Sequence, residues 1–298
     1  MNIFTFLFVV STYLLFIIFR SFTEVSLESQ LLFSSFFILI IGIPHGAIDH
    51  VLFFKKRTLS QIKFYAIYLG LILVFLLLWI YFPFWSLLLF LLISAFHFGE
   101  SQFSEIKASN LIKYLLYPVW GIALLSTLMH YNLLELIDIT TYFKDTNDLQ
   151  ILYDEGFIFQ LYLITNIGSV ILLLLLAVKS QMNLDRLFSE LFLLIILHIT
   201  FYLFPFLIAF TMYFVILHSI KVMHQEYQFL KNDNDTFKLI DFIKILLPYS
   251  LLSIFFTALI IALSYVGIIS YSVPLVSIII ISVITLPHAI VMHIFYNE

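Results

Sequence analysis

Long apolar stretches alternate with short polar breaks along the whole chain. The breaks carry proline, glycine or charged residues, and the apolar stretches are long enough to cross a bilayer as helices. Two of the stretches are short, so eight or nine spans would also fit. Counted in full, the pattern predicts ten spans, over residues 3–19, 31–54, 64–82, 84–99, 111–130, 157–178, 187–203, 206–230, 242–266 and 272–296.

The composition supports the same class of protein. Of 298 residues, 63% are hydrophobic and 11% are charged, and a soluble domain would carry roughly twice that share of charge. No low-complexity tract or soluble domain interrupts the pattern. The first stretch lacks a basic start and a small-residue cleavage site, so we expect it to stay as a span. The sequence therefore predicts an all-α, polytopic transmembrane helix bundle, with residues 1–298 forming one integral membrane domain.

The positive charges predict the orientation of the bundle. With the N-terminus in the cytoplasm, only Arg20 and Lys144 of the 14 Lys and Arg residues fall in outer loops. Cytoplasmic loops normally carry the excess of Lys and Arg. The longest outer loop, residues 131–155, is rich in Asp and Glu instead. We therefore expect both termini to be cytoplasmic, in a multi-pass protein of the cell membrane.

Two further features of the composition exclude whole classes of function. The chain has no cysteine, so disulfides, iron–sulfur clusters and thiolate chemistry are ruled out. Any metal must be held by histidine, carboxylates or carbonyls. The net charge of -4, without a basic stripe, argues against a nucleic-acid partner.

Four of the nine histidines lie at one predicted depth. His45, His97, His218 and His288 fall in the second, fourth, eighth and tenth stretches, which all run from outside to inside. Each lies roughly 18–24 Å along its helix at a rise of about 1.5 Å per residue. A single histidine in a span is often only a helix–helix hydrogen bonder. Four that can converge on one point favour a metal site, because ionisable groups at this depth are usually functional.

The sequence around two of these histidines is similar. Both Pro44-His45 and Pro287-His288 are followed by a second histidine five residues later. Proline inside a helix removes a hydrogen bond and bends the chain, which would curve each helix around whatever the histidine holds. In a regular helix Asp49 shares the face of His45. Asp49 is therefore either a hydrogen-bond partner of a ligand imidazole, whose tautomer it would fix, or an interfacial charge.

The remaining acidic and histidine candidates are weaker. Glu100 follows His97 by three residues and invites the same two interpretations as Asp49. His50 points away from the face of His45, and His224 lies on a different face from His218. Two more histidines, one at the outer end of its helix and one in an oppositely running span, are expected to be structural: His130 and His198.

A set of imidazoles without thiolates suits Fe(II), Cu, Zn or Ni. An octahedral metal with four such ligands keeps two open positions, where dioxygen and a substrate can meet, whereas a structural zinc would be closed. Three other functions compete: a metal- or proton-coupled transporter with an intramembrane histidine site, a di-iron enzyme of the desaturase kind, and a haem protein. The desaturase kind requires many more histidines in tight clusters.

Several motifs resemble, in order, those of one enzyme family. They are the segment Ile43–His50, then Phe96–Glu100, then Leu217-His218-Ser219, then Leu286-Pro287-His288. These are similar to the Brp/Blh family of bacterial and archaeal membrane beta-carotene 15,15'-dioxygenases, related to the bacteriorhodopsin-related protein. The resemblance spans most of the chain. It implies non-haem Fe(2+) held by histidines, with His45, His97 and His218 matching the family's ligands.

Two positions depart from the family pattern. A second histidine usually follows the "His-Ser" histidine by four residues, and here that position is Val222. Either His288 completes the site, the site has three protein ligands, or His224 reaches in; we favour His288 because its depth matches. The acid of the "HFGxxD" motif is replaced by Gln102, which argues against an essential carboxylate at that position.

The resemblance also implies a substrate and partners. It predicts cleavage of the central double bond of beta-carotene, or a related carotenoid, by O2 into two retinals. Such a hydrocarbon dissolves in the bilayer, so the site should open to membrane lipid. A rhodopsin that accepts retinal is the expected protein partner.

Overall fold

The computed structural model describes residues 2–19, 25–106, 110–233 and 236–297. Arg20 and Lys107, which contribute to the charge count, lie outside the described residues. Every regular element within these ranges is helical, and they contain no strand. The predicted all-α class is therefore confirmed for the described part of the chain.

All ten predicted spans are helical, and nine of the described helices or runs of helices are long and apolar enough to cross a membrane. The tenth, Ile3–Phe19, is shorter, with 17 residues. The elements are α1 Ile3–Phe19, α2 Leu27–Phe37, η1 Ile38–Gly42, η2 Ile43–Gly46, α3 Asp49–Lys56, α4 Gln61–Tyr81, α5 Pro83–Phe103, α6 Asn110–Tyr131, α7 Leu133–Tyr142, η3 Lys144–Tyr153, α8 Glu155–Val178, α9 Leu184–Leu203, α10 Phe206–Met212, η4 Tyr213–Ser219, α11 Ile220–Asp233, α12 Leu239–Tyr265 and α13 Val273–Asn297.

The fourth and seventh spans, which looked short in the sequence, are full length. They correspond to α5 and α9, with 21 and 20 residues. The polar loop predicted over 131–155 contains two helical segments, α7 and η3. The sequence pattern missed α7 because it is amphipathic rather than continuously apolar, and it buries Leu133 and Leu136 while Leu134 is exposed.

Two of the spans are not regular α-helices. In the second span, α2 passes into the π-helix η1 and then the 3-10 turn η2 before α3 begins. Pro44 lies at the start of η2, where its missing N–H explains the break. In the eighth span, the π-helix η4 separates α10 from α11. By contrast, α13 continues as one helix with Pro287 inside it. π-segments are rare and frequently mark functional sites.

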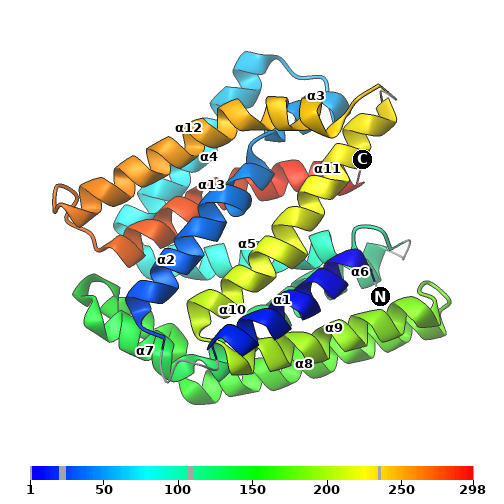
Figure 1. The fold of residues 1–298 in the computed structure, drawn as a ribbon, viewed down its shortest axis with the longest axis horizontal. Coiled ribbons are helices and arrows are strands. Elements are labelled where there is room, and N and C mark those ends of the chain that lie inside the picture. The colour runs from blue at the N-terminus through cyan, green and yellow to red at the C-terminus, as the bar shows by residue number, and fades with distance from the viewer. Residues whose placement is uncertain (1, 20–24, 107–109, 234–235, 298) are drawn as a thin grey trace.

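The arrangement in Figure 1 places α2, α5, α10–α11 and α13 in the middle of the bundle, between α4 and α12 on one side and α1, α8 and α9 on the other. The flanking helices expose large apolar side chains, including Ile62, Val178 and Phe255, as lipid-facing helices do. Figure 1 also shows that α1 begins and α13 ends toward the same end of the molecule. This agrees with termini on one side of a membrane.

A very close helix contact joins α5 to α6 through two glycines. A Cβ placed on Gly99 would lie 2.0 Å from the carbonyl oxygen of Tyr117, and one on Gly121 would lie 1.8 Å from that of Ala95. Small residues permit this backbone approach in membrane helices. Since Ala95 and Gly99 flank His97, the contact fixes the segment of α5 that carries this histidine.

Candidate metal centre

The four histidines singled out by depth are brought together in the centre of the bundle. His45 lies in η2, His97 in α5, His218 in η4 and His288 in α13. All four are buried, with between 1% and 9% of their surface exposed. Four elements that are distant in sequence therefore supply one cluster of imidazoles.

The four rings form a closed cycle. The ring centroid of His45 lies 5.1 Å from that of His218 and 4.8 Å from that of His288. The ring of His97 lies 4.9 Å from His218 and 5.1 Å from His288. Neighbouring rings are nearly perpendicular, at 80° to 84°. Nitrogens about 2.1 Å from one metal would place neighbouring ring centroids roughly 4.5–5.2 Å apart, so the cycle has the size of a metal site.

Three of these histidines meet the stricter test of atom distances. His45, His97 and His288 each offer a ring nitrogen, and these nitrogens lie within 4.8 Å of one another. His218 is not part of this group of three. It closes the cycle opposite His288, because both rings neighbour His45 and His97.

The hydrogen bonding shows which nitrogens are free to bind a ligand. Both ring nitrogens of His97 and of His218 are buried without a hydrogen-bond partner, as is Nε2 of His288. Buried polar atoms are nearly always paired, so five such nitrogens on three neighbouring rings are an exceptional arrangement. Since a neutral imidazole carries a lone pair on only one of its nitrogens, a metal ion would accept one nitrogen from each ring, and the residues present therefore fit one.

Two of the rings are oriented by other residues. The Nδ1 of His45 hydrogen-bonds the carbonyl oxygen of Gly42. The Nδ1 of His288 lies 2.8 Å from Oδ1 of Asp49, whose Oδ2 accepts a 2.8 Å hydrogen bond from the Tyr68 hydroxyl. Such contacts fix the tautomer of an imidazole and turn its other nitrogen toward a metal.

The predicted position of Asp49 beside His45 was wrong, although Asp49 does contact one of the four clustered histidines. We expected Asp49 to share the face of His45, but it contacts His288 instead, and with 3% exposure it is not an interfacial charge. The reason is local: η2 is a 3-10 turn and Ile48 leaves helical geometry, with φ -109° and ψ 20°. The four-residue spacing of a regular helix therefore does not apply between residues 45 and 49.

Glu100 also differs from both expectations. Its side chain is buried, so it is not an interfacial charge, and its described partners are His293 and Asn297 rather than a histidine of the cluster. The distance from its Oε1 to Nδ1 of His293 is 2.7 Å. Glu100 thus joins α5 to the end of α13 and holds the second histidine of the Pro-His motif.

The remaining histidines lie outside the cycle. The His50 ring packs 4.5 Å from Tyr249, and the His224 ring lies 5.6 Å from Phe4. His130 stacks on Tyr162 at 4.5 Å, and His198 packs 5.7 Å from the same Tyr162. Val222 is completely buried in an apolar cluster with Ile48, Leu52 and Met292. Of the candidates for the fourth position, the structure places His288 in the cycle.

Aromatic side chains that the sequence did not single out line the cluster. Phe214 stacks on His218 at 5.5 Å and touches His45 edge-on at 5.5 Å. Phe98 packs against His218 at 4.9 Å. Phe98 follows His97 by one residue, and Phe214 precedes His218 by four. This spacing could have indicated them, but it does not distinguish them among 35 Phe residues. They give the cluster apolar walls that exclude water.

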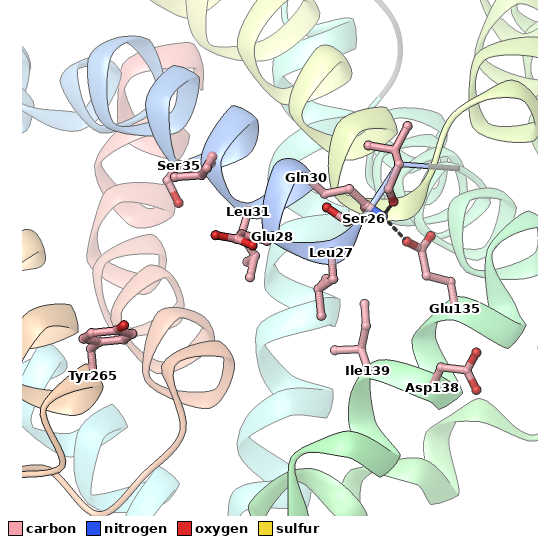
Figure 2. A pocket seen from close by; sticks show the side chains of 12 residues that line it. Ser26, Leu27, Glu28, Gln30, Leu31, Ser35, Glu135, Asp138, Ile139 and Tyr265 are labelled. Atoms are coloured by element: carbon pink, nitrogen blue, oxygen red, sulfur yellow. Dashed lines mark hydrogen bonds between the residues drawn. The ribbon is translucent and has the colours of Figure 1, made fainter. Parts of the chain in front are cut away.

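A separate hollow of about 840 Å³ lies near the ends of α2, α7 and α12. Figure 2 shows Gln30 and Glu135 joined by a hydrogen bond at its edge, with Tyr265 on the opposite side. Its lining includes Leu27, Leu31 and Ile139 as well as acidic side chains. None of the four clustered histidines lines it.

Comparison with known proteins points to one family. The family model described as beta-carotene 15,15'-dioxygenase matches residues 36–296. A beta-carotene 15,15'-dioxygenase from an uncultured marine bacterium, 66A03, is 42% identical over 72 residues, which are 22% of this chain and 26% of that protein. The match thus spans about a quarter of that relative. No solved structure matches the chain significantly.

Proposed function

Because the chain belongs to the beta-carotene 15,15'-dioxygenase family, whose model covers residues 36–296, we propose that it cleaves the central double bond of beta-carotene with O2 to give two retinals. The observation that carries the proposal is the buried cycle of His45, His97, His218 and His288. Its imidazoles, three of which have unpartnered buried nitrogens, form a thiolate-free ligand set that suits Fe(II).

The roles of the residues follow from their contacts. The four imidazoles would hold iron, and Asp49 and Gly42 would orient two of them. Bound Fe(II) would supply the positions at which O2 and the polyene react. Phe98 and Phe214 cover the histidines with apolar surface, which keeps water away and suits a hydrocarbon. Glu100 contacts His293 and Asn297 rather than the four imidazoles in this arrangement.

The setting of the reaction is also part of the proposal. Apolar helices on the outside of the bundle fit a cell membrane from which the carotenoid enters laterally. The excess of Lys and Arg in alternate loops favours cytoplasmic termini. Retinal released into the lipid would be available to a rhodopsin.

The proposed chemistry has a direct test. Protein purified from cells that make beta-carotene should contain one iron per chain, and its activity should require Fe(II) and O2. Labelled dioxygen should leave one oxygen atom in each retinal, because both atoms enter the products. Metal analysis and mass spectrometry of the retinals provide the measurement. Full activity after complete removal of iron would refute the iron centre, and an intact carotene pool would refute the substrate.

Replacing Asp49 with alanine should weaken the centre without destroying it. The change removes the acceptor for Nδ1 of His288, and loss of such a partner costs about 10–100-fold in metal affinity or activity. Tyr68→Phe is the matched control, because it removes only the hydroxyl that contacts the other Asp49 oxygen. Iron titration and retinal formation should rank wild type and Tyr68→Phe above Asp49→Ala. Equal iron affinity in all three would show that Asp49 does not support His288.

A further inference from the structure

Lys221 makes an unusual set of contacts on the buried side of α11. Only 6% of its surface is exposed, and burying a charge is costly unless it is fully hydrogen-bonded. Its Nζ donates to the carbonyl oxygens of Ser101 at 3.0 Å and Gln102 at 3.2 Å, and to Oε1 of Gln102 at 3.1 Å. An ammonium group has three N–H donors. All three are therefore used on one short segment of α5.

The acceptors are the carbonyls at the end of a helix. α5 ends at Phe103, and the last four carbonyls of an α-helix have no partner within it. They also form the negative end of the helix dipole, which favours a cation. Lys221 thus caps α5 from a neighbouring helix.

A third helix holds the Gln102 side chain in place. The Nε2 of Gln102 donates a 2.7 Å hydrogen bond to Oε2 of Glu190, which lies on α9. Oε1 of Glu190 in turn lies 2.7 Å from Nε of Arg186, and Nη2 of Arg186 donates to the Gln102 carbonyl at 3.2 Å. We call Lys221, Gln102, Glu190 and Arg186 the polar clamp. It joins α5, α9 and α11.

The clamp lies within a few residues, along α5 and α11, of two of the clustered histidines. Ser101 is one helical turn after His97, and Lys221 is three residues after His218. His218 belongs to the π-helix η4, which ends at Ser219. If η4 relaxed to α-helical geometry, the residues on one side of it would rotate by about 100°, the turn per residue of an α-helix. An anchor just beyond η4 opposes that rotation.

We propose that Lys221 is a positioning residue that fixes His218 relative to His97 by tying α11 to the end of α5. The inference rests on the proposed metal centre for its functional meaning. Its structural part, the retention of η4, does not depend on any metal.

The test compares Lys221→Met, which keeps the length of the side chain but not its donors, with wild type. Asn132→Leu is the matched control, because it removes a buried interhelical hydrogen bond to the Phe201 carbonyl far from the clamp. Gln102→Leu serves as a milder second variant, since it leaves both carbonyl acceptors in place. Lys221→Arg tests rescue by another cation. Each protein is measured metal-free by hydrogen exchange, and with Co(II) by titration and by its visible spectrum.

Lys221→Met should raise hydrogen exchange over residues 213–219, lower Co(II) affinity about 10–100-fold and alter the Co(II) spectrum. Lys221→Arg should show weaker changes than Lys221→Met in exchange, affinity and spectrum, because it restores a cation. Gln102→Leu should also show smaller changes than Lys221→Met. Asn132→Leu should show none of these changes. Unchanged exchange in Lys221→Met, or in Gln102→Leu if the methionine variant does not fold, would overturn the proposal. A wild type that binds neither Co(II) nor iron refutes the metal centre, while the exchange result still decides the clamp.

Discussion

Replacing His288 with alanine is expected to abolish retinal formation and most iron binding, whereas replacing His224 should leave both. The His288 ring neighbours His45 and His97 in the cycle, and its Nε2 has no other partner. The His224 ring packs near Phe4 instead. Loss of a direct ligand should exceed the roughly 10–100-fold cost of losing an outer hydrogen-bond partner.

Alanine at His45, His97 or His218 should have the same effect as at His288. His130→Ala and His198→Ala are the controls, because these rings pack on Tyr162 away from the cycle. Iron per chain and retinal produced in carotene-making cells are the two measurements. Loss of iron in His224→Ala together with its retention in His288→Ala would show that the wrong fourth histidine has been assigned.

Gly121→Ala is expected to destabilise the protein severely. The new methyl carbon would lie 1.8 Å from the Ala95 carbonyl oxygen, so α5 and α6 must move apart. Overpacking a core against side chains costs about 1–3 kcal/mol, and a backbone atom cannot rotate away, so we expect about 3 kcal/mol or more. The displacement would also shift His97, which lies between Ala95 and Gly99.

Gly70→Ala is the matched control for this change. Gly70 is also helical, but nothing lies within 4 Å of its added Cβ, and alanine is favoured over glycine in a helix by about 1 kcal/mol. Thermal unfolding in detergent should therefore show a large drop for Gly121→Ala and for Gly99→Ala, with no drop for Gly70→Ala. Similar transitions for all three would mean that α5 and α6 are not closely packed.

The sequence by itself determined the class of the fold and the identity of the clustered histidines. Spans can be read from composition because lipid leaves the backbone no partner except a helix. The matched depth of His45, His97, His218 and His288 followed from helical rise alone, since a long span fixes position along its own axis. The helix α7 could not be predicted in this way, because it is amphipathic and has no continuous apolar run.

Only the tertiary structure decided what each side chain contacts. Position around a helix axis depends on local geometry, and η2 rotates Asp49 away from His45 and toward His288. Contacts between helices are not encoded in spacing at all, so neither the meeting of Glu100 with His293 nor that of Lys221 with the end of α5 could be predicted. Depth is a property of one helix, whereas a binding site is made by several helices packed in one particular register.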